Sequence, residues 1–269
     1  GRGGGHQAAM MAGQTQMRDV MQKTDITIVG AGPAGLACAI VLAQAGRDVT
    51  VREWHADVGH RFHEDFQGLE NWSRAGDALD ELRSAGIATD FEHHAFDSGT
   101  VFDPAGRRYP VRGVRPLFYL VRRGRTDGTL DRALLDQARA AGVEVRFGDR
   151  VRNFDTAGVL ATGPRQAGVI AVGYVFDTDM ADGAYLALGN RLAPGGYAYL
   201  LIQGGRGTMA SCIFTGFRDQ ARHLAATGEF FARHVGLQMH NPRPFGGFGN
   251  IRLPTSAVQG GHPVIGEHA

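Results

Sequence analysis

The stretch DITIVGAGPAGLACAIVLAQAGRDVTVRE, residues 25–53, decides the fold of this chain. The apolar run 26–29 predicts a strand, residues 36–45 predict a helix, and 48–51 predict a second strand. Between the first strand and the helix, Gly30, Gly32 and Gly35 have the spacing G-x-G-x-x-G. Glu53 follows the second strand. Strand, glycine turn, helix, strand and acid in this order predict a dinucleotide-binding βαβ unit.

Each residue type in this fingerprint has a physical role. The first glycine permits a tight turn, the second lets the backbone approach a pyrophosphate, and the third allows close packing of helix on strand. The helix N-terminus offers N–H groups to phosphates, and the acid is placed to accept from ribose hydroxyls. A glycine-rich turn in an unrelated α/β unit is the alternative in a chain with 40 glycines. The predicted cofactor-binding residues here are Gly30, Gly32, Pro33, Ala34, Gly35 and Glu53.

Composition excludes several classes of protein. The 269 residues suffice for one large domain or two closely joined domains, and 43% hydrophobic and 20% charged residues are typical of a globular protein. A net charge of +1 gives no reason to expect nucleic acid as a partner. Two distant cysteines, Cys38 and Cys212, indicate no disulfide scaffold, which predicts a cytoplasmic location.

Both ends of the chain stand out. Residues 1–23 are polar and glycine-rich without the apolar core of a signal peptide, so we expect a disordered leader. The apolar stretch 26–45 is interrupted by glycine and proline, which favours a strand-turn-helix over a transmembrane segment. The chain stops soon after a predicted strand at 263–265, so we expect the C-terminus to be truncated.

The rest of the chain alternates between the two patterns. Residues 54–75 predict a loop, with Asn71 or Ser73 capping a helix that continues over 77–84, and Asp103 to Gly106 predict the turn of a β-hairpin within 90–119. A helix is expected over 128–141, strands over 143–147 and 158–161, antiparallel strands over 168–217, a helix over 218–235 and a last strand over 245–253. This predicts an α/β fold in which a Rossmann-like domain (24–89, 120–167, 256–269) is interrupted by an antiparallel β-sheet substrate domain (90–119, 168–255).

With these residues in place, the chain resembles the FAD-dependent oxidoreductases of the glutathione-reductase-like superfamily. It is similar in particular to the geranylgeranyl-reductase-like group, which shares its fold with the aromatic hydroxylases. The fingerprint carries the resemblance together with three further motifs: Arg123 before LDRALL (130–135), VLATGP (159–164) and VIGE (264–267). The resemblance implies FAD as cofactor and assigns contacts with it to Arg123, Gly163, Gly266 and Glu267.

The resemblance also indicates where a substrate binds. The family loop after the second strand approaches the flavin, which places Arg61 at the cofactor and Phe62 in the substrate pocket. The stretch PGGYAYLLI (194–202) corresponds to P-x-x-Y-x-W-x-F-P of the geranylgeranyl reductases and implies pocket positions for Tyr197 and Tyr199. Tyr199, Leu201 and Ile202 replace its Trp, Phe and last Pro, so prenyl specificity does not follow. The hydroxylases' D-G motif is also missing after Gly163, where Pro164 and Arg165 stand.

These observations lead to one hypothesis and two alternatives. We expect a FAD-dependent enzyme that transfers a hydride between flavin and an apolar, lipid-like or prenyl-like small molecule, with NAD(P)H as a candidate electron donor. The alternatives are a flavin monooxygenase or hydroxylase, and a truncated fragment without activity. No catalytic acid or base is assigned. No metal site is expected, because His60, His63, Glu64 and Asp65 do not have a zinc-site spacing. Peripheral contact with a membrane stays open.

Overall fold

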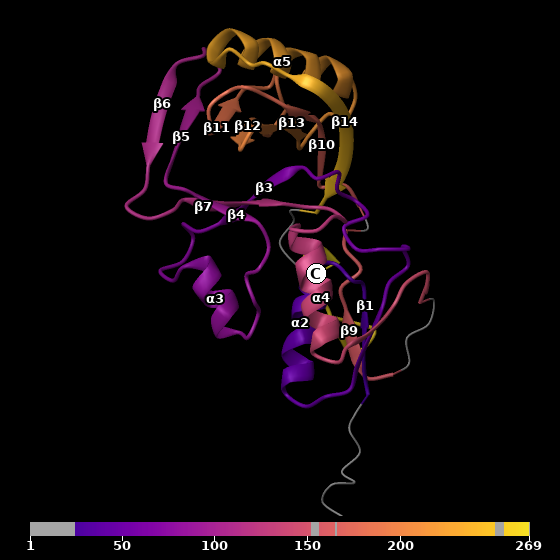
Figure 1. The fold of residues 1–269 in the computed structure, drawn as a ribbon. Helices are drawn as coiled ribbons and strands as arrows, with labels where there is room; N and C mark the ends of the chain where they lie inside the picture. The colour runs from indigo at the N-terminus through magenta and orange to yellow at the C-terminus, as the bar shows by residue number, and fades with distance from the viewer. Residues whose placement is uncertain (1–24, 152–155, 165, 251–255, 269) are drawn as a thin grey trace, which may run out of the picture.

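The structure, a computed structural model, describes residues 25–151, 156–164, 166–250 and 256–268. The fingerprint lies in a four-stranded parallel sheet with strand order β8-β2-β1-β9. We call this sheet and its two helices the fingerprint unit. Its elements are β1 (Ile26–Val29), α2 (Pro33–Gln44), β2 (Val49–Arg52), α4 (Leu130–Ala140), β8 (Glu144–Arg146) and β9 (Gly158–Leu160). The predicted βαβ unit is therefore present, and α2 and α4 lie side by side (Figure 1).

The two helices of this unit begin for different reasons. In α2, Pro33 occupies the first turn and no side chain caps the N-terminus, whereas the Thr129 hydroxyl caps α4 by accepting from the Arg132 N–H. Leu36 from α2 and Leu135 from α4 are fully buried in one core with the sheet residue Ile28. Burial of apolar side chains from both helices against the parallel strands is the main stabilising contribution here.

A seven-stranded sheet, with strand order β14-β10-β13-β12-β11-β5-β6, forms the sheet unit together with one helix. The strands are β5 (Ser98–Phe102), β6 (Arg108–Arg112), β10 (Val169–Asp177), β11 (Gly183–Leu188), β12 (Tyr197–Gln203), β13 (Arg206–Ile213) and β14 (His240–Gly249). The helix α5 (Gln220–Val235) covers the outer face of this sheet (Figure 1). The strands from 168–217 pair antiparallel as predicted, and β5 joins β11 as a parallel neighbour.

Alternation along β12 divides the two faces of the sheet unit. Ala198, Leu200 and Ile202 are completely buried in the core beneath α5. Because side chains alternate between faces, Tyr197 and Tyr199 point to the opposite side. That side faces a three-stranded sheet and the fingerprint unit (Figure 1).

The three-stranded sheet contains a strand that the sequence pattern missed. It consists of β3 (Phe66–Glu70), β7 (Phe118–Arg122) and β4 (His93–Phe96), with β7 in the centre. Residues 54–75 are thus not all loop, because β3 pairs with β7 about fifty residues further along the chain. The hairpin prediction for 90–119 is also only partly right: β5 and β6 form the hairpin around Asp103, but β4 and β7 pair with one another in this other sheet.

The predicted helix caps at Asn71 and Ser73 were wrong. The helix α3 (Ala78–Ser84) is capped by Asp77, whose carboxylate accepts from the Leu79 and Asp80 N–H groups. The Asn71 side chain contributes differently, because its oxygen accepts from the Ala78 N–H at 2.7 Å. Asp77 directly precedes the helix in sequence, whereas Asn71 reaches the start of the helix only because the chain folds back between the two residues.

The C-terminal segment contacts the fingerprint unit at β9. A small hairpin, β15 (Val258–Gln259) and β16 (His262–Pro263), precedes it, and η1 (Gly266–His268) follows. Val264 forms a parallel bridge to Leu160, and the Ile265 N–H donates to the Leu160 carbonyl at 2.9 Å. The leader 1–23 and the end of the strand predicted over 245–253 lie outside the described residues. No helix within the described ranges is both long and apolar enough to cross a membrane.

Candidate active site

A cleft of about 810 Å³ separates the fingerprint unit from the sheet unit. One wall consists of the glycine turn, the loop after β2 and the end of β9; the other is the inner face of β10, β12 and β14. We call these the fingerprint wall and the sheet wall. Residues that are far apart in the sequence therefore line the same cleft, and most of the predicted cofactor residues are among them.

The three fingerprint glycines have different surroundings. Gly30 has φ +111°, and a Cβ there would lie 2.2 Å from the Ala161 carbonyl oxygen. A Cβ on Gly35 would lie 2.0 Å from the Gly30 carbonyl oxygen, whereas a Cβ on Gly32 would meet nothing within 4 Å. Gly30 and Gly32 line the cleft and Gly35 does not. Gly35 therefore has the packing role that the motif predicts, and a direct contact with a cofactor stays a prediction for it.

The start of α2 has the properties of an anion site. Pro33 and Ala34 line the cleft, no side chain caps the helix, and its first turn contains no acidic residue. The exposed N–H groups and the positive end of the helix dipole are therefore available to a phosphate. Gly32 leaves the space in front of them open. These residues fit the pyrophosphate of a dinucleotide.

Glu53 is oriented by the backbone of the fingerprint wall. One carboxylate oxygen accepts from the Ala31 N–H at 2.7 Å and the other from the His55 N–H at 2.9 Å. A carboxylate has about four acceptor sites, so two remain for hydroxyl donors in the cleft. This geometry suits the ribose contact that the sequence predicted, which stays a prediction.

A row of aromatic and cationic side chains extends from Glu53 along the cleft, and of these the sequence had drawn attention only to His60, as a residue without metal-site spacing. The Arg150 guanidinium lies 4.4 Å from the centre of the Trp54 ring, and the His55 and His60 rings stack at 4.0 Å. His60 Nδ1 is 2.8 Å from the Arg125 guanidinium. Stacking and cation–π contacts hold this row of side chains together at the mouth of the cleft. Within the described ranges no three possible metal ligands converge.

Arg61 and Glu267 meet although 206 positions separate them. Their side chains form an ion pair of 2.9 Å, and Arg61 also donates to the Phe248 carbonyl oxygen at the end of β14. Gly266 packs against the start of α2, because a Cβ on it would lie 2.9 Å from the Ala34 Cβ. Arg61 thus connects the loop after β2 with β14 and the C-terminal segment. Gly163 lies beside it in the lining of the same cleft.

Arg123 lines the cleft but is committed to protein partners. Its guanidinium forms two hydrogen bonds of 2.9 Å with Asp131, which is only 1% exposed. A third bond of 3.1 Å reaches the Gln67 side-chain oxygen. The guanidinium also covers the Phe62 ring, 3.8 Å from its centre. Arg123 and Phe62 therefore sit in the cleft as one stacked pair, and the contact of Arg123 with a cofactor stays a prediction.

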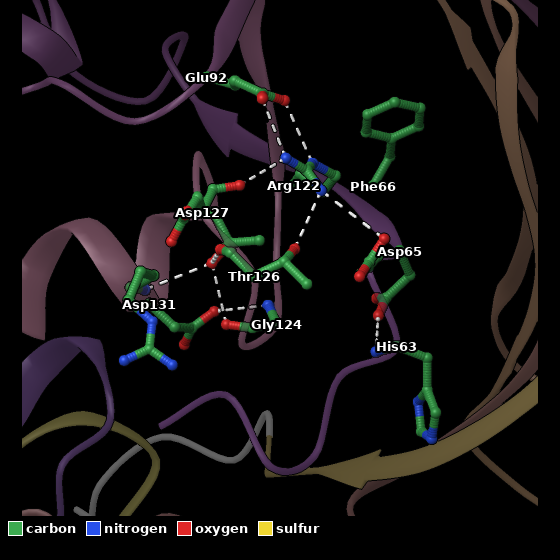
Figure 2. A network of polar contacts seen from close by, with 12 residues as sticks. His63, Asp65, Phe66, Glu92, Arg122, Gly124, Thr126, Asp127 and Asp131 are labelled. Carbon is green, nitrogen blue, oxygen red and sulfur yellow. Dashed lines mark hydrogen bonds and ion pairs between the residues drawn. The ribbon is translucent and has the colours of Figure 1, made fainter. Parts of the chain in front are cut away.

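Arg122 belongs to a separate network on the other side of β7, shown in Figure 2. It donates to both carboxylate oxygens of Glu92 at 2.9 and 3.1 Å and also binds Thr126 and the Asp127 carbonyl oxygen. Its exposure is 7%, so Arg122 is a buried charge held by this network. The pattern of two adjacent arginines on a strand predicts opposite faces, but only the fold shows what each one meets.

The sheet wall brings Tyr199 into the cleft but not Tyr197. Tyr199 lines the cleft, as do Ala171 on β10 and Phe245 on β14. Tyr197 lies further along the same face, 37% exposed, and shares a hydrogen bond with Cys212; burial raises the pKa of this tyrosine to about 12. Tyr197 does not line this cleft, and a pocket role for it stays a prediction. Its position at the start of β12 is a property of the sheet that spacing does not reveal.

Asp65 is a deeply buried carboxylate beside the sheet wall, in the loop whose polar groups the family resemblance places near the flavin or substrate. It is 2% exposed, lines the cleft, and accepts from the His63 N–H at 2.9 Å (Figure 2). Burial raises the pKa of this carboxyl above its usual range, and the hydrogen bonds oppose the shift. The sequence gives only a weak indication of this burial, because Asp65 is an acid directly before the apolar Phe66 in a stretch that was expected to be a loop.

Comparisons with known proteins agree with this geometry. The sequence profile of a family described as FAD binding domain matches residues 23–167. A digeranylgeranylglycerophospholipid reductase of Methanopyrus kandleri is 31% identical over 153 residues; the match covers 51% of this chain and 36% of that protein. The chain thus spans about a third of the length of that relative.

Two solved structures share the fold. A geranylgeranyl bacteriochlorophyll reductase-like protein of Thermoplasma acidophilum has a TM-score of 0.67 at 17% identity, covering 91% of this chain and 71% of its own. A p-nitrophenol 4-monooxygenase of Pseudomonas putida has a TM-score of 0.65 at 14% identity, covering 91% and 73%. The predicted α/β architecture with an antiparallel sheet unit is confirmed. With the profile matching more than half of its residues, the chain belongs to the FAD binding domain family.

Proposed function

We propose that this chain is a FAD-dependent oxidoreductase that transfers a hydride between flavin and an apolar or lipid-like organic substrate. The observation that carries the proposal is the cleft with two unlike walls. The uncapped start of α2, Gly32 and Glu53 fit the dinucleotide part of FAD, while Ala171, Tyr199 and Phe245 offer an apolar surface opposite. When bound, FAD supplies the redox chemistry, and the protein supplies orientation.

The residues of the chain have distinct tasks in this proposal. The N–H groups at the start of α2 hold the phosphates, and Glu53 accepts from the ribose. Arg61 keeps the Glu267 carboxylate at the C-terminal end of the cleft, where it is placed to accept from ribityl hydroxyls. Phe62, held beneath the Arg123 guanidinium, limits water in the space between the walls.

The reductase reading is supported by the Methanopyrus kandleri relative, whose name describes a lipid reductase. We therefore place the chain near the geranylgeranyl-reductase-like group of the glutathione-reductase-like superfamily. A prenyl-like or other lipid-like small molecule is the substrate class we favour, and NAD(P)H is the electron donor we propose. Both cysteines are free thiols, which supports a cytoplasmic location; peripheral contact with a membrane would suit a lipid substrate.

A flavin monooxygenase is the second candidate. Tyr199 favours this candidate, because it stands where the P-x-x-Y-x-W-x-F-P stretch of the geranylgeranyl reductases has Trp. The fold shared with a p-nitrophenol 4-monooxygenase is compatible with it. The two candidates differ in one measurable respect: only the monooxygenase incorporates oxygen into its product.

The test begins with the absorption spectrum of the purified chain after addition of FAD and removal of the excess. We expect a retained band near about 450 nm, the signature of bound flavin. NADH or NADPH is then added with and without oxygen in the presence of candidate lipids and phenols. Saturation of a lipid double bond, with NAD(P)H oxidised and no oxygen consumed, supports the reductase, and an oxygenated product supports the monooxygenase. A chain that retains no FAD contradicts both.

A further inference from the structure

A continuous chain of polar side chains runs along the cleft and ends at Asp65. Asp131 binds Arg123, Arg123 Nη1 donates to the Gln67 oxygen at 3.1 Å, and Gln67 Nε2 donates to Asp65 at 3.3 Å. All four residues line the cleft. Asp131, at one end of this chain, is buried, so the chain holds Asp65, at the other end, in a defined orientation.

The end of this chain lies against the sheet wall. The N–H of Phe66, directly after Asp65, donates to the Thr208 hydroxyl on β13 at 2.8 Å in a buried hydrogen bond. Thr208 pairs with Leu201 on β12, two positions from Tyr199 on the same face. Burial, with contributions from Cys212 and Asp65, raises the pKa of Tyr199 well above its usual value, so its phenol keeps the proton. Asp65 and Tyr199 are thus neighbours that both line the cleft.

The lining of the cleft near these two residues is partly apolar. Ala171 and Phe245 line the sheet wall together with Tyr199, and Phe62 lies beneath Arg123. A polar group on a bound molecule would be desolvated here, and a desolvated group needs a hydrogen-bond partner. The Asp65 oxygens supply hydrogen-bond acceptors, and the Tyr199 phenol supplies a donor. A neutral hydroxyl donates one hydrogen bond and accepts another, so it matches this combination, whereas a hydrocarbon would leave both groups without a partner.

Resting on the proposed function, we infer that Asp65 and Tyr199 form a recognition pair for one hydroxyl group on an otherwise apolar substrate. The pair determines specificity: it distinguishes an alcohol or phenol from the corresponding hydrocarbon. Asp65 is buried because it serves this contact, and the chain through Gln67 and Arg123 holds it in place. This defines the substrate class of the cleft more narrowly than apolar character does.

The test compares two probes that differ by one hydroxyl group, 2-naphthol and naphthalene, by equilibrium dialysis against the full chain with FAD. We expect the wild-type protein to bind 2-naphthol at least about fivefold more tightly than naphthalene, the effect of one or two hydrogen bonds. Asp65→Ala and Tyr199→Phe each remove a hydrogen-bonding group, and each should reduce this ratio to about two or less.

Matched controls keep the experiment specific. Asp136→Ala changes an exposed acid on α4, and Tyr174→Phe changes a tyrosine that packs beneath α5 on the opposite face of the sheet. Both should keep the wild-type ratio. Circular dichroism and retained FAD verify that each variant is folded.

Three outcomes would overturn the inference: no preference for 2-naphthol in the wild type, an unchanged ratio in both site variants, or a folded variant that loses both probes equally. Dialysis measures binding of the two probes, and the absorption band measures retention of FAD, so the two results are read independently of one another. A chain that shows the hydroxyl preference without retaining FAD would contradict the proposed function and support the recognition pair.

Discussion

The fingerprint wall and the sheet wall enclose the same cleft but are built from different parts of the chain. In the fingerprint wall, backbone atoms carry the site: Gly30, Gly32 and the N–H groups of α2 stand within a few residues of one another. In the sheet wall and beside it, side chains carry the site, and Asp65, Tyr199 and Phe245 come from separate strands or loops. A backbone site depends on local geometry, whereas a side-chain site depends on strand pairing.

This difference predicts different responses to substitution. A change in the fingerprint wall should alter folding or cofactor binding through space and backbone conformation. A change beside the sheet wall should alter the choice of substrate and the pH dependence, because the functional groups there are ionisable side chains. Substitutions at Gly30, at the two adjacent arginines, at Gly32 and at Asp65 test this contrast, with expected effects that decrease in this order.

Gly30→Ala should destabilise the protein by about 4 kcal/mol or more, since it combines a left-handed backbone with overlap against the Ala161 carbonyl. Gly142→Ala is the matched control: Gly142 has φ +86°, but a Cβ there would meet nothing within 4 Å. We expect it to cost about 1 kcal/mol from the backbone alone. Urea unfolding measures both, and equal values would show that the close approach at Gly30 does not matter.

The adjacent arginines should respond unequally. Arg123→Met leaves the Asp131 carboxylate, 1% exposed, without its ion-pair partner, and should cost about 3 kcal/mol. Arg122→Met leaves Glu92, whose side chain is 56% exposed and remains solvated, and should cost about 1 kcal/mol. Thermal unfolding of the two variants side by side tests this order. A larger loss for Arg122→Met would mean that its network, not the cleft pair, supports β7.

Gly32→Ala should leave folding intact but weaken FAD binding on the order of tenfold, equivalent to about 1.4 kcal/mol. The added methyl group meets no protein atom and projects into the space in front of the α2 N-terminus. Gly228→Ala, within α5 and away from the cleft, should leave the affinity unchanged. Titration of each apoprotein with FAD measures the affinity. An unaltered affinity in Gly32→Ala would mean that the phosphates do not bind in front of α2.

Asp65→Asn should stabilise the protein slightly at neutral pH. Because burial raises the folded-state pKa of Asp65 above its usual 3.8, the wild type loses stability as the pH rises from 3.8 through the folded-state value. Asparagine does not ionise, so we expect a gain in Tm on the order of 2 °C at pH 7.5 that disappears near about pH 4. Asp136→Asn should show no such pH dependence, and a constant gain at all pH values would point to packing instead.

Much of the fingerprint unit could be predicted because its signals are local. Strand, glycine turn, helix and acid follow one another within 25–53, and the close approaches at Gly30 and Gly35 match the roles expected from the motif. β3 could not be predicted in the same way, because Phe66 and Leu69 show no alternating pattern and the strand exists through its pairing with β7. The exclusion of Tyr197 from the cleft is likewise a matter of sheet geometry.

The sequence by itself determined the parallel βαβ unit, the antiparallel sheet and the position of Glu53, because periodicity and glycine spacing act over a few residues. Only the tertiary structure decided which wall each later segment joins. The pairing of Arg61 with Glu267, the separate partners of Arg122 and Arg123, and the burial of Asp65 beside Tyr199 all depend on contacts across long stretches of chain. Burial and ionisation are properties of an environment, and that environment exists only after distant strands have paired.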